Sequence, residues 1–441
     1  MTPDPKIVKS VEKLDYRVTV GDVAAQAGLE LNFAQQGLLA LASEAGGHLQ
    51  VAESGDVVYL FPKNFRSILR NKYWRLRWQQ TWEKVWRVLF YLIRISFGII
   101  LIASILLMVV AIIAIFIAMN SSNDERKGGG NRGNSYGGGG GFFFVPRFWL
   151  GDIFLWFDPG YNRRRRQRRR QATGSYQMNF LESVFSFLFG DGNPNADLEE
   201  HRWQTIGAVI RSHKGAVVGE QIAPYVDETD RDEDYMLPVL SRFNGYPEVS
   251  PQGEIIYYFP ELQVMASSRQ LEPVASVGYL QEKPWRFSQA TSGQITMAAG
   301  LGAVNIILAF VLGTLLQDGT IAAELGGIVA FAASIQWLLL GYGSLYLLIP
   351  LIRYFWIQGR NPKIVKRNQS REQRAIALHQ SDPSLRQKIA YASQFAQQKV
   401  IGDRDITYTT EDDLLDQNIK NADRLDRDWQ QRIDQGIKNQ E

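Results

Sequence analysis

The residue types that usually perform catalysis or bind metals are sparse in this chain. None of its 441 residues is a cysteine, which excludes disulfides, thiolate catalysis and thiolate-bound zinc or iron–sulfur clusters held by this chain alone. Its four histidines, His48, His201, His213 and His379, show no metal-ligand spacing. The sequence holds no phosphate-binding loop, dinucleotide fingerprint, zinc-protease motif or nucleophile elbow. We therefore expect no enzyme, and we assign no catalytic residue, cofactor or metal.

A module of 43 residues occurs twice in the chain, at an offset of 198 and without a gap. Val20-Gly21-Asp22 returns as Val218-Gly219-Glu220, and residues 47–62 (GHLQVAESGDVVYLFP) return as residues 245–260 (GYPEVSPQGEIIYYFP). Six of those sixteen positions are identical. The offset is too long for a solenoid, whose period is about 20–50 residues. The sequence therefore predicts one folded module that is used twice.

Each copy is predicted to be an α+β module with three helices followed by a strand hairpin. In the first copy, Asn32 is the expected N-cap of the third helix and Gly46-Gly47 its end. The expected elements are helices from Pro5 to Tyr16, from Val20 to about Gly28 and from Asn32 to Ala45, then strands His48–Ala52 and Val57–Phe61. This order resembles the winged helix, so we place winged-helix-like modules at 1–63 and 197–265.

The charge of the modules bears on what they bind. Residues 1–63 hold five basic and eight acidic side chains, and residues 197–262 hold five and thirteen. Because nucleic-acid affinity depends on Lys and Arg contacts to phosphates, we expect protein partners, or packing of the modules on each other, and no nucleic acid. The acids of the second copy also suit a helix N-terminus. The residues that we assign to partner binding are Asp232, Glu233, Asp234, Tyr235 and Phe243.

Apolar segments add α-helical transmembrane segments to this fold class. Residues 95–119 are 25 residues without a charge. At 1.5 Å per residue they reach about 37 Å, enough for a hydrocarbon core of about 30 Å. Residues 294–352 are predicted to form a membrane hairpin, in which Asn305 and Gln336 can bond to each other. Lys and Arg are concentrated at 66–87 and 353–374, which predicts that both flanks face the cytoplasm or the stroma.

A single span at 95–119 would leave the second module on the far side of the membrane. We expect the aromatic segment 142–157 to return the chain as a short crossing, and the alternative is an interfacial segment. Its Arg147 and Asp152 are expected to pair or to lie at the interface. The seven arginines within 163–170 favour the crossing, because arginines resist translocation. The glycine-rich residues 120–141 are predicted to be a flexible linker.

Aromatic and basic residues alternate from Tyr73 to Arg87. This pattern predicts an interfacial helix at 64–94 over anionic lipid, with single-stranded nucleic acid as the alternative ligand. The predicted lipid-interface residues are Trp74, Trp78, Trp82, Arg75, Arg77, Arg163, Arg164 and Arg165. The remaining segments are predicted as a basic linker with an amphipathic stretch (158–196), a linker (266–293) and a polar helical tail (353–441).

The chain carries the paired endings VVYLFP (57–62) and IIYYFP (255–260), together with the hairpin at 294–352. In these features it resembles a family of cyanobacterial and chloroplast integral membrane proteins. The resemblance implies a thylakoid or plasma membrane, and the support of photosynthetic complexes. Plant proteins similar to this group carry an iron–sulfur-biogenesis label. The absence of cysteine puts direct cluster ligation by this chain in doubt.

Three hypotheses follow for function. The first is a non-catalytic membrane scaffold or assembly factor whose acidic modules bind protein partners at the cytoplasmic or stromal face. The second is a membrane-tethered DNA-binding transcriptional regulator. The third is a small transporter built on the hairpin, which would need dedicated polar residues. The sequence leaves the identity of the partner and the oligomeric state open.

Overall fold

The computed structural model describes residues 4–124 except 73, 178–267 except 230 and 231, 278–417 except 318 and 381, and positions 419, 422, 429 and 430. The described chain is mostly helical, with small sheets. It divides into two compact units, which we describe one at a time. Unit 1 is Met1–Trp86, Asn193–Trp285 and Gln358–Glu441, and unit 2 is Arg87–Gly192 and Arg286–Ile357.

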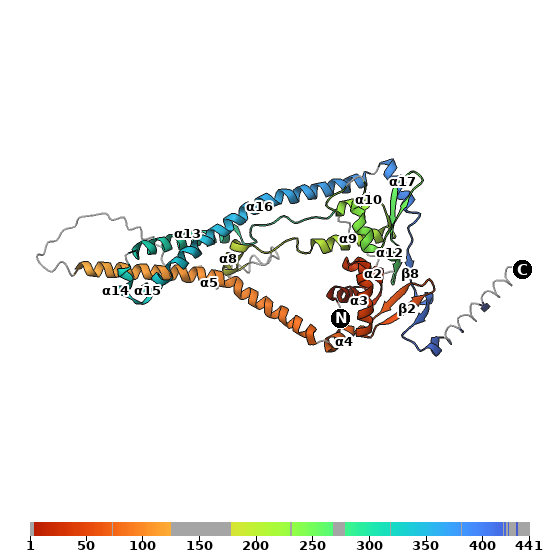
Figure 1. The fold of residues 1–441 in the computed structure, drawn as a ribbon, viewed down its shortest axis with the longest axis horizontal. Coiled ribbons are helices and arrows are strands. Elements are labelled where there is room, and N and C mark those ends of the chain that lie inside the picture. The colour runs from red at the N-terminus through yellow and green to blue at the C-terminus, as the bar shows by residue number, and fades with distance from the viewer. Residues whose placement is uncertain are drawn as a thin grey trace, which may run out of the picture. The chain divides into compact units, whose positions relative to one another are not determined.

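Module 1 opens unit 1 and is drawn in red and orange (Figure 1). Its elements are α1 (Pro5–Lys13), β1 (Arg17–Thr19), α2 (Val20–Ala27), α3 (Leu31–Ala45), β2 (His48–Ala52), β3 (Val57–Leu60) and α4 (Phe65–Lys72). β3 pairs antiparallel with both β1 and β2. Gly28 and Gly46 end α2 and α3 in the left-handed conformation. The expected N-cap at Asn32 is wrong, because α3 begins at Leu31 with Glu30 as its N-cap.

Module 2 repeats this order of elements. It consists of α9 (Leu198–Ser212), β4 (Ala216–Val217), α10 (Gly219–Ile222), the 3-10 turns η1 (Ala223–Tyr225) and η2 (Asp234–Met236), α11 (Leu237–Phe243), β5 (Tyr246–Val249) and β6 (Ile255–Tyr258). α12 (Pro260–Gln263) and β7 (Val264–Met265) follow. β6 lies between β4 and β5, as β3 lies between β1 and β2.

The identical residues of the repeat have the same structural task in both copies. Gly55 and Gly253 have φ values of 85° and 86° in the turns of the two hairpins, a conformation that favours glycine. A Cβ at Gly47 would overlap the ring of Phe61, and a Cβ at Gly245 would overlap the ring of Phe259. Both rings are buried, so each glycine makes room for a core aromatic.

The two copies differ by one residue at the start of their second helix. The hairpins match at an offset of 198, since His48 faces Leu60 and Tyr246 faces Tyr258. The Thr19 N–H donates to Asp22, whereas the Val218 N–H donates to Gln221, and 221 − 22 gives 199. The repeat therefore has a one-residue gap in the structure, although the sequence aligns without one.

A single hydrophobic core joins the two modules. It includes Ile7, Leu38 and Phe61 from module 1 and Ile206, Phe243 and Phe259 from module 2. Burial of these side chains removes apolar surface from water, which is the dominant favourable contribution to folding. The two modules therefore form one folded body. This agrees with the alternative prediction that the modules pack on each other.

The tail differs from the predicted polar helix, because it also contributes strands. It contains the end of α16 (Gln336–His379), α17 (Pro383–Ala392), β8 (Lys399–Val400), the turn η4 (Asp403–Asp405) and β9 (Ile406–Thr409). β8 pairs in parallel with β7, and β9 adds a fourth strand to module 1 beside β2.

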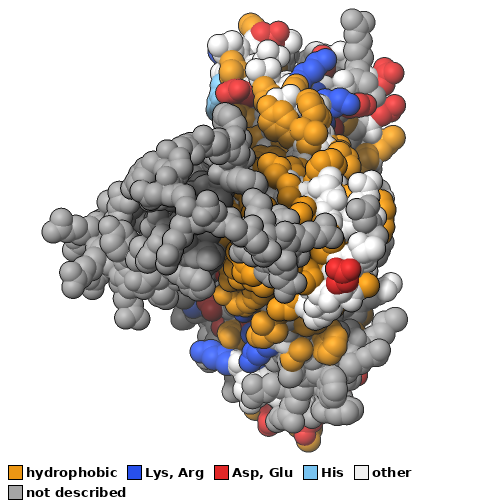
Figure 2. Space-filling model, turned by 90° about the vertical axis from the view of Figure 1, so that its left-hand side faces the viewer, with side chains coloured by type: hydrophobic (Ala, Val, Ile, Leu, Met, Phe, Trp, Pro, Cys, Tyr) orange, Lys and Arg blue, Asp and Glu red, His pale blue; other side chains and the backbone are white. Residues whose placement is uncertain are grey.

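Unit 2 contains apolar helices. Its elements lie in α5 (Trp74–Asp124), α8 (Phe180–Phe189), α13 (Ser292–Leu315), α14 (Thr320–Leu325), α15 (Gly327–Ser334) and the first part of α16. Among the described residues, three helices are long and apolar enough to cross a membrane: Lys84–Asn120, Ser292–Leu315 and Gln336–His379. The hairpin is interrupted at Ile335, between α15 and α16. Hydrophobic side chains cover much of the described face in Figure 2.

Candidate functional site

An ion pair lies at the contact between the modules. Asp22 in α2 is fully buried, and its Oδ1 is 2.6 Å from Arg211 Nη2 in α9. Its Oδ2 accepts hydrogen bonds from the N–H groups of Thr19 and Ala266. The carboxylate thus has the several donors that a buried charge requires. Asp22 of module 1 therefore binds both Arg211 of module 2 and the backbone of Ala266, which follows β7.

Small residues let α2 and α9 approach closely. A Cβ at Gly207 would lie 2.9 Å from the Cα of Ala25. Nearby, Arg242 donates to the carbonyl of Gly28 at 2.6 Å and stacks on Trp203 with its Cζ 4.1 Å from the ring centre. Arg242 is the single cation of α11, and it is committed to this contact.

A second ionic group ties the far end of α16 to module 2. Arg371 has no exposed surface and donates to Asp227 and Glu282, while Arg367 binds both oxygens of Glu282. Burial raises the pKa of Glu282, but the hydrogen bond from Arg367 and the charges of Arg371 and Arg367 outweigh it and hold the pKa below its ordinary value. Burial also raises the pKa of Asp227, but the hydrogen bonds and charges of Arg371 and Arg202 outweigh it and hold the pKa below its ordinary value.

Three asparagines bind the backbone of the segment 282–285. Asn368 accepts from the N–H of Glu282 at 2.9 Å and donates to its carbonyl at 2.8 Å. Asn195 makes the same pair of bonds with Lys283, and Asn361 with Trp285. A side-chain amide can donate and accept at once, so each asparagine satisfies both the N–H and the carbonyl of one residue of the segment. The segment is thereby fixed to α16 and to the start of module 2.

The α17 socket is the surface of module 2 that receives α17, and it consists of Val218, Glu220, Glu233, Glu254 and Ile256. Lys388 of α17 lies 2.7 Å from Glu233, 3.0 Å from Glu220 and 3.8 Å from Glu254, and its side chain is 3% exposed. Burial lowers the pKa of Lys388, but its bonds to Glu233 and Glu220 outweigh that effect and raise the pKa overall.

Around Lys388, apolar side chains of α17 complete the contact. Leu385, Ile389 and Ala392 pack with Val218 and Ile256 in a cluster of their own. The ring of Phe395 stacks on Tyr258, with centres 5.7 Å apart. The tail therefore binds module 2 through one buried lysine and a small apolar face.

Two strand edges of the modules, those of β2 and β5, are protected. β9 covers β2, and Gln417 donates to the carbonyl of Thr409 and accepts from its N–H on the outer side of β9. β5 carries Pro247, which cannot donate a ladder hydrogen bond. These features limit pairing with other chains.

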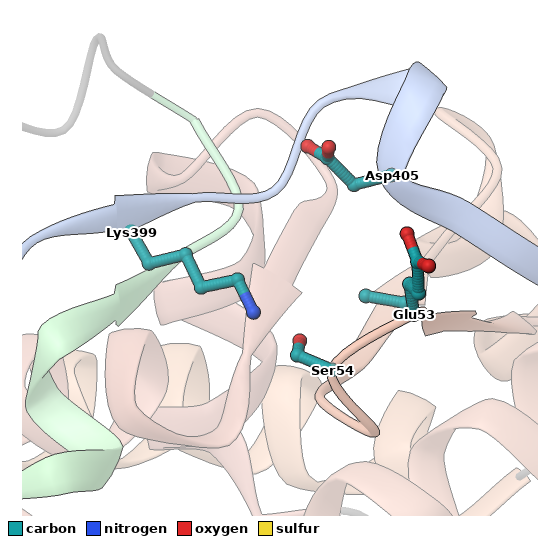
Figure 3. Close-up of a pocket in the computed structure, with 5 residues that line it drawn as sticks. Glu53, Ser54, Lys399 and Asp405 are labelled. Atoms are coloured by element: carbon teal, nitrogen blue, oxygen red, sulfur yellow. The ribbon is translucent and has the colours of Figure 1, made fainter.

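A shallow, open depression lies where the tail meets the hairpin turn of module 1. It has a volume of about 310 Å³ and is lined by Ala52, Glu53, Ser54, Lys399 and Asp405. Lys399 points toward Ser54 in Figure 3 and forms an ion pair with Asp56 at 3.1 Å. In the described part of the chain, no three His, Asp or Glu side chains are arranged to hold a metal ion.

The residues assigned to partner binding are in different environments. Asp232 and Asp234 are exposed at the start of η2. Glu233 accepts hydrogen bonds from Lys388 and Tyr257, and Tyr235 is half-buried against the core. Phe243 has no exposed surface. Glu220, Glu254 and Lys388 were missed; Glu220 occupies a repeated position, but no local pattern marks Lys388.

Only part of the predicted lipid interface lies within the described residues. Trp82 is 58% exposed on α5. The side chains of Trp74, Arg75, Arg77 and Trp78 lie outside the described set, as do Arg163, Arg164, Arg165, the linker from residue 125 and the segment 142–157. The predicted bond between Asn305 and Gln336 is wrong: Asn305 donates to Ser104 at 2.6 Å, and Gln336 donates to the carbonyl of Ala309.

The comparison with known proteins places the chain. A chloroplast protein of Arabidopsis thaliana, At5g03900, is 40% identical over 439 residues, which cover 96% of this chain and 81% of the relative. The chain belongs to the family of this chloroplast protein. The name of the relative gives its location, the chloroplast, and no activity. No family model and no solved structure matches the chain.

This relationship supports the coarser part of the expected resemblance, a plant and chloroplast family. The match covers 96% of this chain, which includes the modules and the three candidate spans. In this chain the ionic groups and the tail hold the two modules together as one body. Module 2 is the more acidic of the two.

Proposed function

We propose that the chain is a non-catalytic, multi-pass membrane adaptor, of thylakoid type, whose twin winged-helix-like modules hold a protein partner on the stromal side. The chloroplast relative and the three apolar helices support the membrane setting. The winged-helix assignment is supported by the repeated order of elements and by the matching antiparallel sheets. The Lys and Arg flanks of the apolar helices support the sidedness.

One observation carries the choice of a protein partner over DNA. α3 has the position of a recognition helix, yet its exposed residues Asn32, Phe33, Gln35, Gln36, Leu39 and Ser43 include no cation. In module 2 the corresponding α11 contains Arg242 alone, and this side chain binds Gly28 and Trp203. Nothing on these helices can neutralise phosphates, which supply most nonspecific nucleic-acid affinity.

The acidic surface of module 2 is the partner side in this proposal. Glu228 and Asp232 are exposed, and they lie in the acid-rich stretch 227–234 (DETDRDED). Such a surface attracts a basic protein surface and raises its association rate. The photosynthetic or other complexes of the same membrane are the class of partner that this setting offers.

Affinity purification of the tagged full-length chain from membranes in mild detergent tests the proposal. Wild type is expected to retain a defined partner that the double variant Glu228→Lys, Asp232→Lys loses. Glu372→Lys, an exposed charge reversal on α16, is the matched control and should retain it. Equal recovery in all three proteins, or no partner at all, would contradict the adaptor role.

A gel shift separates the DNA-binding alternative. The full-length protein is needed, because the two modules share one core and neither is shown to fold alone. At low salt we expect no shift of double-stranded DNA. Binding that weakens steeply with added salt would favour the regulator instead.

A further inference from the structure

We propose that the α17 socket is a docking site for a basic amphipathic helix of a partner protein, and that α17 is its occupant within the chain. The proposal rests on the adaptor function and names the chemistry of its partner. The bound helix and the socket are both described, so the fit can be derived from their contacts.

The helix that the socket receives has a defined pattern. Leu385, Lys388, Ile389 and Ala392 follow the spacing i, i+3, i+4, i+7, which places them on one helix face. Lysine is rarely buried unless it is paired, yet the Lys388 side chain is 3% exposed among three carboxylates. A matching ligand is therefore a helix with a lysine between apolar residues, which is the helix-in-groove mode of recognition.

Three carboxylates of the socket lie within 4 Å of one ammonium group of α17. Glu220, Glu233 and Glu254 surround the single ammonium of Lys388. Glu220 Oε2 is buried and accepts no hydrogen bond in the described structure. A buried carboxylate oxygen without a donor is unfavourable. A partner helix with a second Lys or Arg at this point would satisfy that oxygen and bind more strongly than α17.

The attachment of α17 is suited to exchange. Its apolar cluster is separate from the shared core and has three fully buried members, Val218, Ile256 and Ala392. The side chains of Glu220 and Glu254 are 41% and 51% exposed, so two of the three carboxylates are partly open to solvent. α17 also has its own start signal, since the Asp382 side chain accepts from the Leu385 N–H and Pro383 follows it.

The matching position in module 1 is closed in another way. Val58 corresponds to Ile256 and packs under Ala266 and Ile401, which belong to the paired segments around β7 and β8. Arg17 bonds to the carbonyls of both Ala266 and Ile401 and so fixes that cover. On module 2 a bond to a backbone carbonyl lies just after α17, where Gln263 donates to the carbonyl of Phe395 at 2.8 Å.

The test measures binding of a fluorescent peptide of residues 382–395 to the full-length protein in nanodiscs. The variant Lys388→Glu weakens the occupant, so the peptide should bind it at least tenfold more tightly than it binds wild type, where α17 competes at a high effective concentration. Lys399→Glu reverses another tail lysine, paired with Asp56, and should behave as wild type.

Two further measurements keep the outcome decisive. Adding Glu233→Gln to Lys388→Glu should remove the gain in peptide affinity. Hydrogen exchange of the β6 amides should slow on peptide binding, which also reports whether the variant has retained its fold. Equal affinity in wild type and Lys388→Glu, or a gain that survives Glu233→Gln, would overturn the proposal. If the affinity purification of wild type recovers no partner while the peptide binds as expected, the result contradicts the adaptor function and not the exchange of α17.

Discussion

Arg211 Nη2 lies 2.6 Å from Oδ1 of Asp22, and this pair joins the two copies of the repeat within their common core. Asp22 is a repeated position, since Glu220 matches it in sequence. In module 2, Gln221 takes the N–H of Val218, and Glu220 is thereby available to Lys388. A shift of one residue has given two related acids different partners.

Loss of the Arg211 charge should destabilise the twin-module body. Arg211→Met leaves the buried Asp22 carboxylate without its cation, and breaking a buried pair costs about 3–5 kcal/mol. Lys6→Met removes the ion pair with Glu200, whose side chains are 48% and 36% exposed, and should cost about 1 kcal/mol or less. Urea unfolding of both proteins, followed by tryptophan fluorescence, gives the comparison; similar losses would show that Asp22 is solvated.

A methyl group at Gly207 should separate α2 from α9. Its Cβ would lie 2.9 Å from the Cα of Ala25, a backbone atom that cannot move aside cheaply, so Gly207→Ala is expected to cost about 1–3 kcal/mol. Gly359 is exposed on α16, and no atom lies within 4 Å of an added Cβ there. Gly359→Ala should therefore be neutral or stabilising by up to about 1 kcal/mol. Thermal unfolding of the two variants measures this difference, and a stable Gly207→Ala would contradict the close contact.

Within the apolar helices, Ser104→Ala should weaken the contact between α5 and α13. The variant removes the acceptor of the 2.6 Å bond from Asn305, and interhelical hydrogen bonds of this type contribute about 0.6–2 kcal/mol. Ser334→Ala is the control, because that hydroxyl donates within its own helix to Phe331. Steric-trap unfolding in bicelles can resolve the difference. An equal effect of both variants would argue against a role for the Asn305 bond.

Acid should loosen the ionic group around Arg371. The folded pKa values of Asp227 and Glu282 are lowered from 3.8 and 4.5, so their contribution to stability is present above those values and is lost as the pH falls through the folded values. Unfolding free energies measured from pH 7 down to about pH 2 should decline more steeply in wild type than in Arg371→Met. Parallel curves would mean that Arg371 does not hold these pKa values down.

Local signals explain which parts of the fold could be predicted. Gly28, Gly46 and Gly55 adopt left-handed conformations that end helices or turn a hairpin, so the elements of module 1 were predicted close to their observed limits. Strands β8 and β9 were not predicted, because two to four residues have no period of their own and their partners lie far away in sequence. Phe243 was assigned to partner binding but is fully buried, since the sequence alone does not show whether an apolar side chain faces the core or a partner.

The sequence by itself determined the repeat, the apolar helices and the acidic charge of the modules, since these follow from residue types at short separations. Tertiary structure alone decided that the two copies share one core, that Asp22 meets Arg211, and that Lys388 is buried among the acids of module 2. These ion pairs join residues that are 155 to 189 positions apart in sequence. Whether such a pair stabilises the fold depends on which surfaces the folded chain brings together.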